Sequence, residues 1–228
     1  MKLKSALTIL AGVVSLSARA ALYTYDFNGI NTVIPDGDVA GLSDTHSISG
    51  VAGHITDISV TVNISGGYNG DLYGYLVSDS GFAILLNGIG RTGANPYGSP
   101  GSGMVVTFND VTGTDIHFAP GTFGTPLTGT WASDGRNVDP VNALDTDPRT
   151  ATLSSFIGGN PNGNWTLFLA DTSPIGEGTL NSWSLSLEVS TVPEPTTWAL
   201  AGFGLVFAGT SATRWWQARG RNKHREEP

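Results

Sequence analysis

The chain has 228 residues, a formal net charge of −8 and no cysteine, which excludes disulfide cross-links and thiol catalysis. Between residues 21 and 191 the balance is more acidic, because fourteen Asp and two Glu stand against three Arg, a net charge of −13. A segment this acidic repels nucleic-acid phosphates, so no nucleic-acid partner is expected, whereas divalent cations are natural counterions.

The N-terminal residues have the pattern of a secretory signal peptide. Lys2 and Lys4 precede a short apolar run from Ala6 to Leu16, and Ala18-Arg19-Ala20 has the small-x-small cleavage pattern. The apolar run is too short to span a bilayer. We therefore expect signal peptidase to remove residues 1–20, which leaves residues 21–191 as one folding domain.

The middle of the chain carries the signals of short strands. Residues 55–64 alternate apolar and polar side chains with period two, and residues 72–77 and 83–86 flank the turn-rich Ser78–Gly81 as in a hairpin. Further short β patterns occur at residues 104–108, 165–169 and 183–189. No useful apolar helical stripe occurs before Thr196. The prediction is an all-β jelly-roll sandwich of about eight strands.

Four sequence blocks resemble the P domain (P/Homo B) of proprotein convertases. Residues 68–72 (YNGDL) and 76–81 are similar to its x-x-G-D-L…L-x-S-P-x-G segment, although Asp79 stands where the family has proline. Residues 160–167 (NPNGNWTL) and 178–185 (GTLNSWSL) are similar to its N-P-x-G-x-W-x-L and G-T-L-x-x-W-x-L elements. The resemblance implies an eight-stranded jelly roll, and its structural motif would comprise Gly70, Asp71, Asn162, Gly163, Trp165, Gly178 and Trp183. In convertases the domain supports a subtilisin-like neighbour, of which this sequence shows no motif.

Two acidic regions are candidate cation sites. The stretch 134–147 combines Asp134, Asn137, Asp139, Asp145 and Asp147, which are oxygen ligands of the kind that calcium prefers. It lacks the terminal Glu of an EF-hand, and solvated loop acidity is the alternative. For Asp71 we expect a structural role, with its carboxylate accepting backbone N–H groups from a turn such as Asn162-Gly163. A cation shared by Asp71 and Asp171 is the alternative.

The sequence offers little support for catalysis. His46, His54 and His117 lie in no metalloprotease motif, and no Gly-x-Ser-x-Gly elbow occurs, so the domain is predicted to be non-catalytic. A pocket that joins His54 or His117 to an Asp and a Ser would favour a hydrolase instead. Tyr73 and Tyr75 share one strand face, where they form either a sugar-binding platform or an ordinary sheet surface.

The C-terminal residues resemble the PEP-CTERM sorting signal of Gram-negative bacteria. The motif Pro193-Glu194-Pro195 within residues 192–195 precedes an uncharged apolar run at 196–213, which as a helix would reach roughly 27 Å. The tail 214–228 then supplies Arg214, Arg219, Arg221, Lys223 and Arg225, which should stay cytoplasmic. The resemblance implies a single transmembrane helix in the inner membrane, N-out and C-in, and processing by exosortase. An ordinary membrane anchor is the alternative.

Together these features predict an exported, non-catalytic interaction module that is sorted to the cell surface or the extracellular matrix. Its expected partners are extracellular polymers or surface proteins. A carbohydrate-binding module of the exopolysaccharide matrix is one alternative, and a hydrolase with a cryptic active site or a protease accessory domain is the other.

Overall fold

The computed structural model describes residues 19–191, which form ten strands and three short 3₁₀ helices. The strands are β1 (Arg19–Ile34), β2 (Asp38–Ile48), β3 (His54–Gly66), β4 (Leu72–Ser78), β5 (Gly81–Asn87), β6 (Met104–Phe108), β7 (Thr114–Asp115), β8 (Leu127–Ala132), β9 (Gly163–Asp171) and β10 (Gly178–Thr191). The 3₁₀ helices are η1 (Asn69–Asp71), η2 (Ile116–Phe118) and η3 (Leu153–Phe156). Residues 19–191 contain no α-helix and no helix able to cross a membrane.

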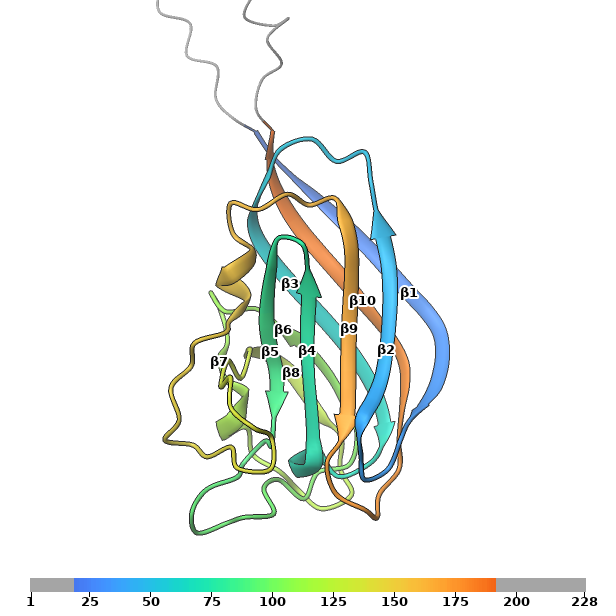
Figure 1. Ribbon diagram of the computed structural model, residues 1–228, viewed down its shortest axis with the longest axis vertical. Coiled ribbons are helices and arrows are strands. Elements are labelled where there is room, and N and C mark those ends of the chain that lie inside the picture. Colours follow the sequence, from blue (N-terminus) through green and yellow to red (C-terminus); the bar gives the residue numbers. More distant parts are fainter. Residues whose placement is uncertain (1–18, 192–228) are drawn as a thin grey trace, which may run out of the picture. The chain divides into compact units, whose positions relative to one another are not determined.

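The strands form two sheets that face each other (Figure 1). One sheet has six strands in the order β1-β10-β3-β6-β8-β7, and the other has four in the order β2-β9-β4-β5. Strand β8 pairs in parallel with β6 and β7, whereas β3, β4 and β9 pair antiparallel with their neighbours. The predicted all-β sandwich and the hairpin at 72–86 are confirmed, since Ser78 pairs with Gly81 across the β4–β5 turn. The jelly-roll connectivity stays a prediction.

The core lies between the two sheets and follows the period-two patterns of the sequence. Trp165 on β9 and Trp183 on β10 each share a strand face with two leucines, and both indoles are almost fully buried. Burying such large side chains supplies most of the stabilisation that a domain without disulfides needs. Strand β1 contributes Tyr23, Tyr25, Phe27 and Ile30, which pack against this core while remaining partly exposed.

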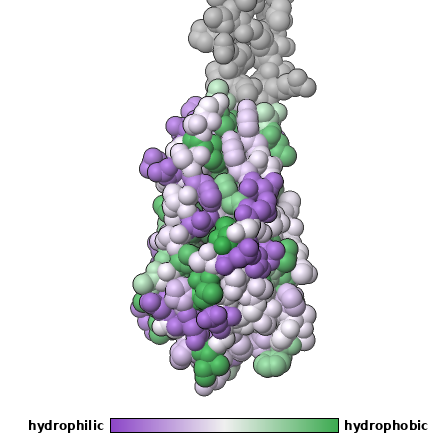
Figure 2. Space-filling view, turned by 90° about the vertical axis from the view of Figure 1, so that its right-hand side faces the viewer, coloured by the Kyte–Doolittle hydropathy of each residue, from purple (hydrophilic) through white to green (hydrophobic). Residues whose placement is uncertain are grey.

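The sandwich has two distinct ends. At one end Gly66 pairs with Gly178, and at the other His54 pairs with Ser190. The segments 67–71, 88–103 and 172–177 meet at the Gly66 end, where Gly67 donates to the carbonyl of Glu177 and Gly70 to that of Ser99. We call these three segments the loop end. On the side where β1 and β2 lie, hydrophobic residues form small separate patches among hydrophilic ones (Figure 2).

Candidate functional site

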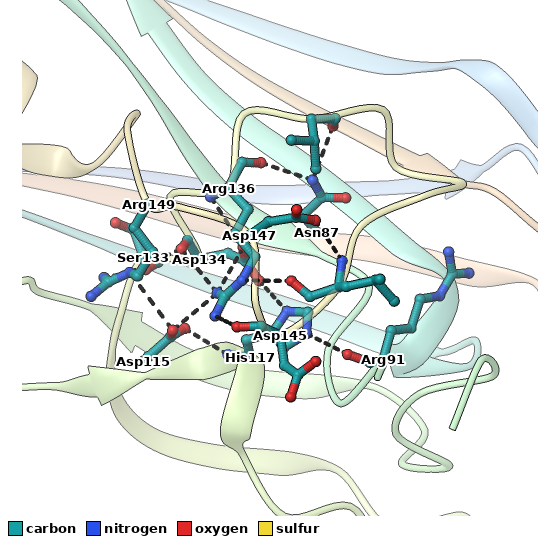
Figure 3. Close-up of polar contacts among 12 residues, drawn as sticks. Asn87, Arg91, Asp115, His117, Ser133, Asp134, Arg136, Asp145, Asp147 and Arg149 are labelled. Atoms are coloured by element: carbon teal, nitrogen blue, oxygen red, sulfur yellow. Dashed lines mark hydrogen bonds and ion pairs between the residues drawn. The ribbon is translucent and has the colours of Figure 1, made fainter. Parts of the chain in front are cut away.

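A buried charge network lies beside β5, where the loop after β8 folds back on the sheet. Asp134 and His117 are fully buried and Arg136 is 2% exposed. The carboxylate of Asp134 contacts His117 Nδ1 at 2.8 Å and Arg136 Nη1 at 3.3 Å, and Arg136 Nη1 also donates to Asp115 Oδ2 at 2.9 Å (Figure 3). Two carboxylates therefore surround one guanidinium, which offsets the cost of removing these charges from water.

His117 is held through both ring nitrogens. Besides the contact with Asp134, its Nε2 lies 2.7 Å from the carbonyl oxygen of Arg91. Both partners are acceptors, an arrangement that favours the imidazolium form, in which both nitrogens donate. Burial lowers the pKa of His117, but the hydrogen bonds to Asp134 and the Arg91 carbonyl outweigh it and raise the pKa above 6.5. This ring has no nitrogen left to act as a base, and Ser133 Oγ donates to Asp110 instead.

The arginines of the network organise the loop between β8 and η3. Arg136 donates to the carbonyls of Leu144 and Asp145 at 3.0 and 3.1 Å, and Arg149 donates to those of Ser133 and Asp134 at 2.7 and 3.0 Å. Carbonyl oxygens that converge on one centre often hold a metal ion, but here the guanidinium groups take that position. The network is thus a scaffold that fixes the loop.

The other oxygen ligands predicted for calcium point to local contacts. Asp139 accepts from the backbone N–H of Val141 and Asp147 from that of Leu144, while Asn137 is exposed. Asp145 contributes its carbonyl to Arg136. Across residues 19–191 no three His, Asp or Glu side chains lie close enough to hold a metal ion. Calcium binding by this loop stays a prediction.

Asp71 and Asp171, the alternative cation site, lie near each other at the loop end. Asp71 Oδ1 accepts from Arg91 Nη2 at 3.1 Å, and Arg91 also donates to the carbonyl of Pro140 at 2.8 Å. Asp171 is 1% exposed; its Oδ1 accepts from Ser173 N–H at 3.1 Å, while its Oδ2 has no partner. Burial raises the pKa of Asp171 to about 6, helped by the nearby charges of Asp71 and Asp36.

The prediction that the Asn162-Gly163 turn donates to Asp71 is wrong. Asn162 instead exchanges two hydrogen bonds with the backbone of Val51, at 2.9 and 2.7 Å, and Val51 precedes β3 at the end opposite to η1. The partner of Asp71 is Arg91, twenty residues along the chain. Sequence proximity of motifs does not reveal this pairing, because the two segments meet only after β4 and β5 have formed their hairpin.

The remaining motif residues have packing roles. Gly70 is buried, and a Cβ there would collide with the carbonyl oxygen of Tyr97, so the 97–99 backbone can lie directly on η1 only if this residue is glycine. Trp165 Nε1 donates to the carbonyl of Pro161, and Trp183 Nε1 to Asp44 Oδ2. Gly178, also buried, begins β10.

A pocket of about 340 Å³ opens at the loop end beside Asp71. Tyr68, Tyr97 and the segment 173–175 line the rest of it. A second pocket of about 310 Å³ lies between segments 91–96 and 141–144. Neither one is lined by His54 or His117, so a pocket of the kind expected for a hydrolase is not among them.

A cluster of aromatic rings occupies the outer face of the four-stranded sheet. Tyr75 stacks on Phe168 with ring centroids 4.6 Å apart, and Tyr73 and Phe82 lie 6.0 and 5.3 Å from Tyr75. All four rings are only partly exposed. Hydroxyl side chains of Ser43, Thr45 and Thr166 flank them on β2 and β9.

The sequence reasoning missed the arginines. Residues 21–191 contain only Arg91, Arg136 and Arg149, and all three are hydrogen-bonded to carbonyl oxygens of loops. Their scarcity in an acidic domain is the available signal, because three cations among sixteen acids are natural structural partners.

Two family models match this chain, and the P-domain match covers the blocks at 160–167 and 178–185 but not those at 68–81. The proprotein convertase P-domain matches residues 136–187, and the PEP-CTERM protein-sorting motif matches residues 191–214. Both resemblances are confirmed. The matched P-domain segment runs from the buried Arg136 through β9 to Leu187 of β10. No curated protein matches the sequence.

Solved structures similar to this one include two of an Aeromonas sobria serine protease. The protease in complex with its chaperone (ORF2) has 16% identity and a TM-score of 0.42 over 76% of this chain, and the protease alone has 15% identity and a TM-score of 0.43 over 77%. The chain spans only 28% of the length of each.

The predicted targeting segments lie outside the described residues. They comprise most of the signal peptide at 1–20, the motif Pro193-Glu194-Pro195, the membrane helix at 196–213 and the basic residues from Arg214 onward. The match to the sorting motif nevertheless supports export and a surface or extracellular destination.

Proposed function

We propose that this protein is an exported, non-catalytic interaction module that exosortase processes and sorts to the cell surface or the extracellular matrix. The observation that carries the proposal is the sorting-motif match at residues 191–214, directly after a β-sandwich that ends at Thr191. The non-catalytic role is supported by His117, whose two ring nitrogens are both occupied in a fully buried network. The partner would be a surface protein or an extracellular polymer.

Fractionation of the native host tests the sorting step. An antibody against residues 21–191 would follow the protein in membrane, matrix and medium for the wild type, for Glu194→Ala and for the matched control Glu226→Ala. We expect Glu194→Ala to stay in the membrane at full length, and Glu226→Ala to leave it as the wild type does. Release of Glu194→Ala at the wild-type rate would refute sorting through this motif and favour an ordinary anchor or another processing route.

A carbohydrate-binding role is the second candidate, and the aromatic cluster on the outer sheet favours it. Half-exposed rings of Tyr73, Tyr75 and Phe168 beside the hydroxyls of Thr45 and Thr166 are the combination on which sugar rings stack. Affinity electrophoresis through the host exopolysaccharide should show retardation of the wild type that Tyr75→Ala weakens. Equal mobility of the two proteins would remove this candidate.

A further inference from the structure

The loop end carries an excess of negative charge that the sandwich itself does not neutralise. Burial raises the pKa of Asp71 and of Asp171, the nearby charge of Asp36 adds to both shifts, and Arg91 is the cation that contacts Asp71. The other two arginines of residues 21–191 are engaged with Asp115 and Asp134, and this segment contains no lysine. A cation from outside the sandwich is therefore the missing electrostatic partner.

The pocket beside Asp71 has the right walls for an organic cation. Tyr68 precedes Asp71 in the sequence and Tyr97 follows it, and both tyrosines line the pocket. Tyr97 is 75% exposed. An aromatic face attracts an ammonium or guanidinium group, and a carboxylate adds a directed hydrogen bond. Arg91 approaches Asp71 through Oδ1 and is itself 7% exposed, so it meets the carboxylate from the protein interior.

The rim of the pocket is held in a strained conformation. Ile175 has a φ of 81°, which is a rare value for a β-branched residue, and its side chain is 87% exposed. Asp36 Oδ2 accepts the backbone N–H of Ile175 at 3.0 Å and so fixes this conformation. Strain of this kind with an exposed apolar side chain is typical of sites where a ligand binds.

We propose that this pocket binds a lysine or arginine side chain of a partner protein. The cationic head would contact Asp71, its aliphatic stem would pass between the tyrosines, and Pro174 and Ile175 would cover the stem. A bare metal ion fits less well, because no three His, Asp or Glu side chains within residues 19–191 converge on one point and the cavity of about 340 Å³ is large for one ion. The inference rests on the proposed interaction role and specifies that the partner presents a lysine or arginine side chain.

Asp171 supports this assignment from a second direction. Its Oδ1 accepts from Ser173, which lines the pocket, while its buried Oδ2 has no partner, which is a costly state for a carboxyl group. Burial and the neighbouring acids raise the pKa of both Asp71 and Asp171. A bound cationic side chain would lower the pKa of both Asp71 and Asp171 and would reduce the electrostatic repulsion among the three acids.

The test uses the purified full chain in a non-ionic detergent. The probe is a fluorescent peptide of alternating Lys and Gly with blocked ends, and the same peptide with Glu in place of Lys serves as the reference ligand. Fluorescence anisotropy would be measured for Asp71→Asn and Tyr97→Ala. The controls are Asp26→Asn, which removes the same charge from exposed β1, and Phe123→Ala, which removes an equally exposed ring outside the pocket.

We expect the Lys peptide to bind, the Glu peptide not to bind, and Asp71→Asn and Tyr97→Ala each to weaken affinity by about tenfold. The controls should change it by less than about twofold, as expected for distant charges and rings. Equal losses in Asp71→Asn and Asp26→Asn, or an unaltered affinity in Tyr97→Ala, would overturn the pocket assignment. Calcium binding that depends on Asp71 and not on Tyr97 would overturn it in favour of a metal site.

This experiment can fail independently of the proposed function. If the native protein reaches the surface or the matrix and the Lys peptide does not bind, only the partner chemistry is wrong. If the protein is never exported, the sorting proposal is wrong whatever the peptide does.

Discussion

Replacing Arg136 by methionine should destabilise the sandwich strongly. The guanidinium of Arg136 is hydrogen-bonded to the carboxylates of Asp115 and Asp134 and to the carbonyls of Leu144 and Asp145, and the residue is 2% exposed. Methionine fills a similar volume but removes the cation nearest to Asp115, which keeps only Arg149 at 3.7 Å, and it leaves Asp134 paired with His117 alone. Removal of one partner from a buried ion pair costs roughly 3–5 kcal/mol.

The assay is urea-induced unfolding of residues 20–191, which form one compact unit with its own core. With a slope of about 2 kcal/mol per M, the midpoint should fall by roughly 1.5–2.5 M, and the melting temperature by about 6–20 °C. The matched control is Arg149→Met, because the Arg149 side chain is 34% exposed and pairs with Asp115 at the longer distance of 3.7 Å. Its cost should be about 1–2 kcal/mol.

The reasoning would be refuted if Arg136→Met cost less than about 1 kcal/mol, a range typical of surface pairs, or no more than Arg149→Met. A mutant that still unfolds cooperatively with the predicted loss would establish that the network holds the loop between β8 and η3.

Burial raises the pKa of Asp171 from 3.8 to about 6, so the folded state prefers the protonated carboxyl and loses roughly 3 kcal/mol of stability as the pH rises from below 3.8 to above 6. Asp171→Asn should thus raise the urea midpoint at pH 7.5 but not at pH 3.5, and equal effects at both pH values would contradict that origin. Gly70→Ala should cost about 1–3 kcal/mol because its methyl group meets the carbonyl of Tyr97, whereas Gly93→Ala, with open space around it, should change the melting temperature little. If the 134–147 loop binds calcium, millimolar calcium should raise the melting temperature and EDTA should reverse the rise, while identical melting curves would leave the loop as solvated acidity.

The strands that alternate strictly could be predicted, whereas β1, β2, β7 and β8 were not found from the sequence. Residues 55–64 lie within β3 and residues 183–189 lie within β10. One face of each strand is buried, so apolar residues occupy every second position. Strand β2 reads Asp-Val-Ala-Gly-Leu-Ser-Asp-Thr, with few apolar residues, because it is an edge strand that is largely exposed. Pairing with β9 holds it in place, which no local pattern records.

The functional site could be predicted only in part, for a similar reason. The favoured expectation for Asp71, a contact with the Asn162-Gly163 turn, is wrong, whereas the alternative that placed Asp71 near Asp171 agrees with their position at one end of the sandwich. The contact of His117 with Asp134 joins η2 to the loop after β8, and the contact of Arg91 with Asp71 joins a loop to η1. These pairs form only once the sheets have assembled, so the spacing of the residues in the sequence does not encode them.

The pairing of β10 with β3 puts the last described residue and the tyrosine-lined pocket at opposite ends of the sandwich. The tail continues from Thr191, beside the His54 end of β3, whereas the tyrosine-lined pocket lies beyond Gly66 and Gly178 at the opposite tip. Residues 20–191 coupled to a solid support through the C-terminal end of β10 would therefore present the pocket to solvent.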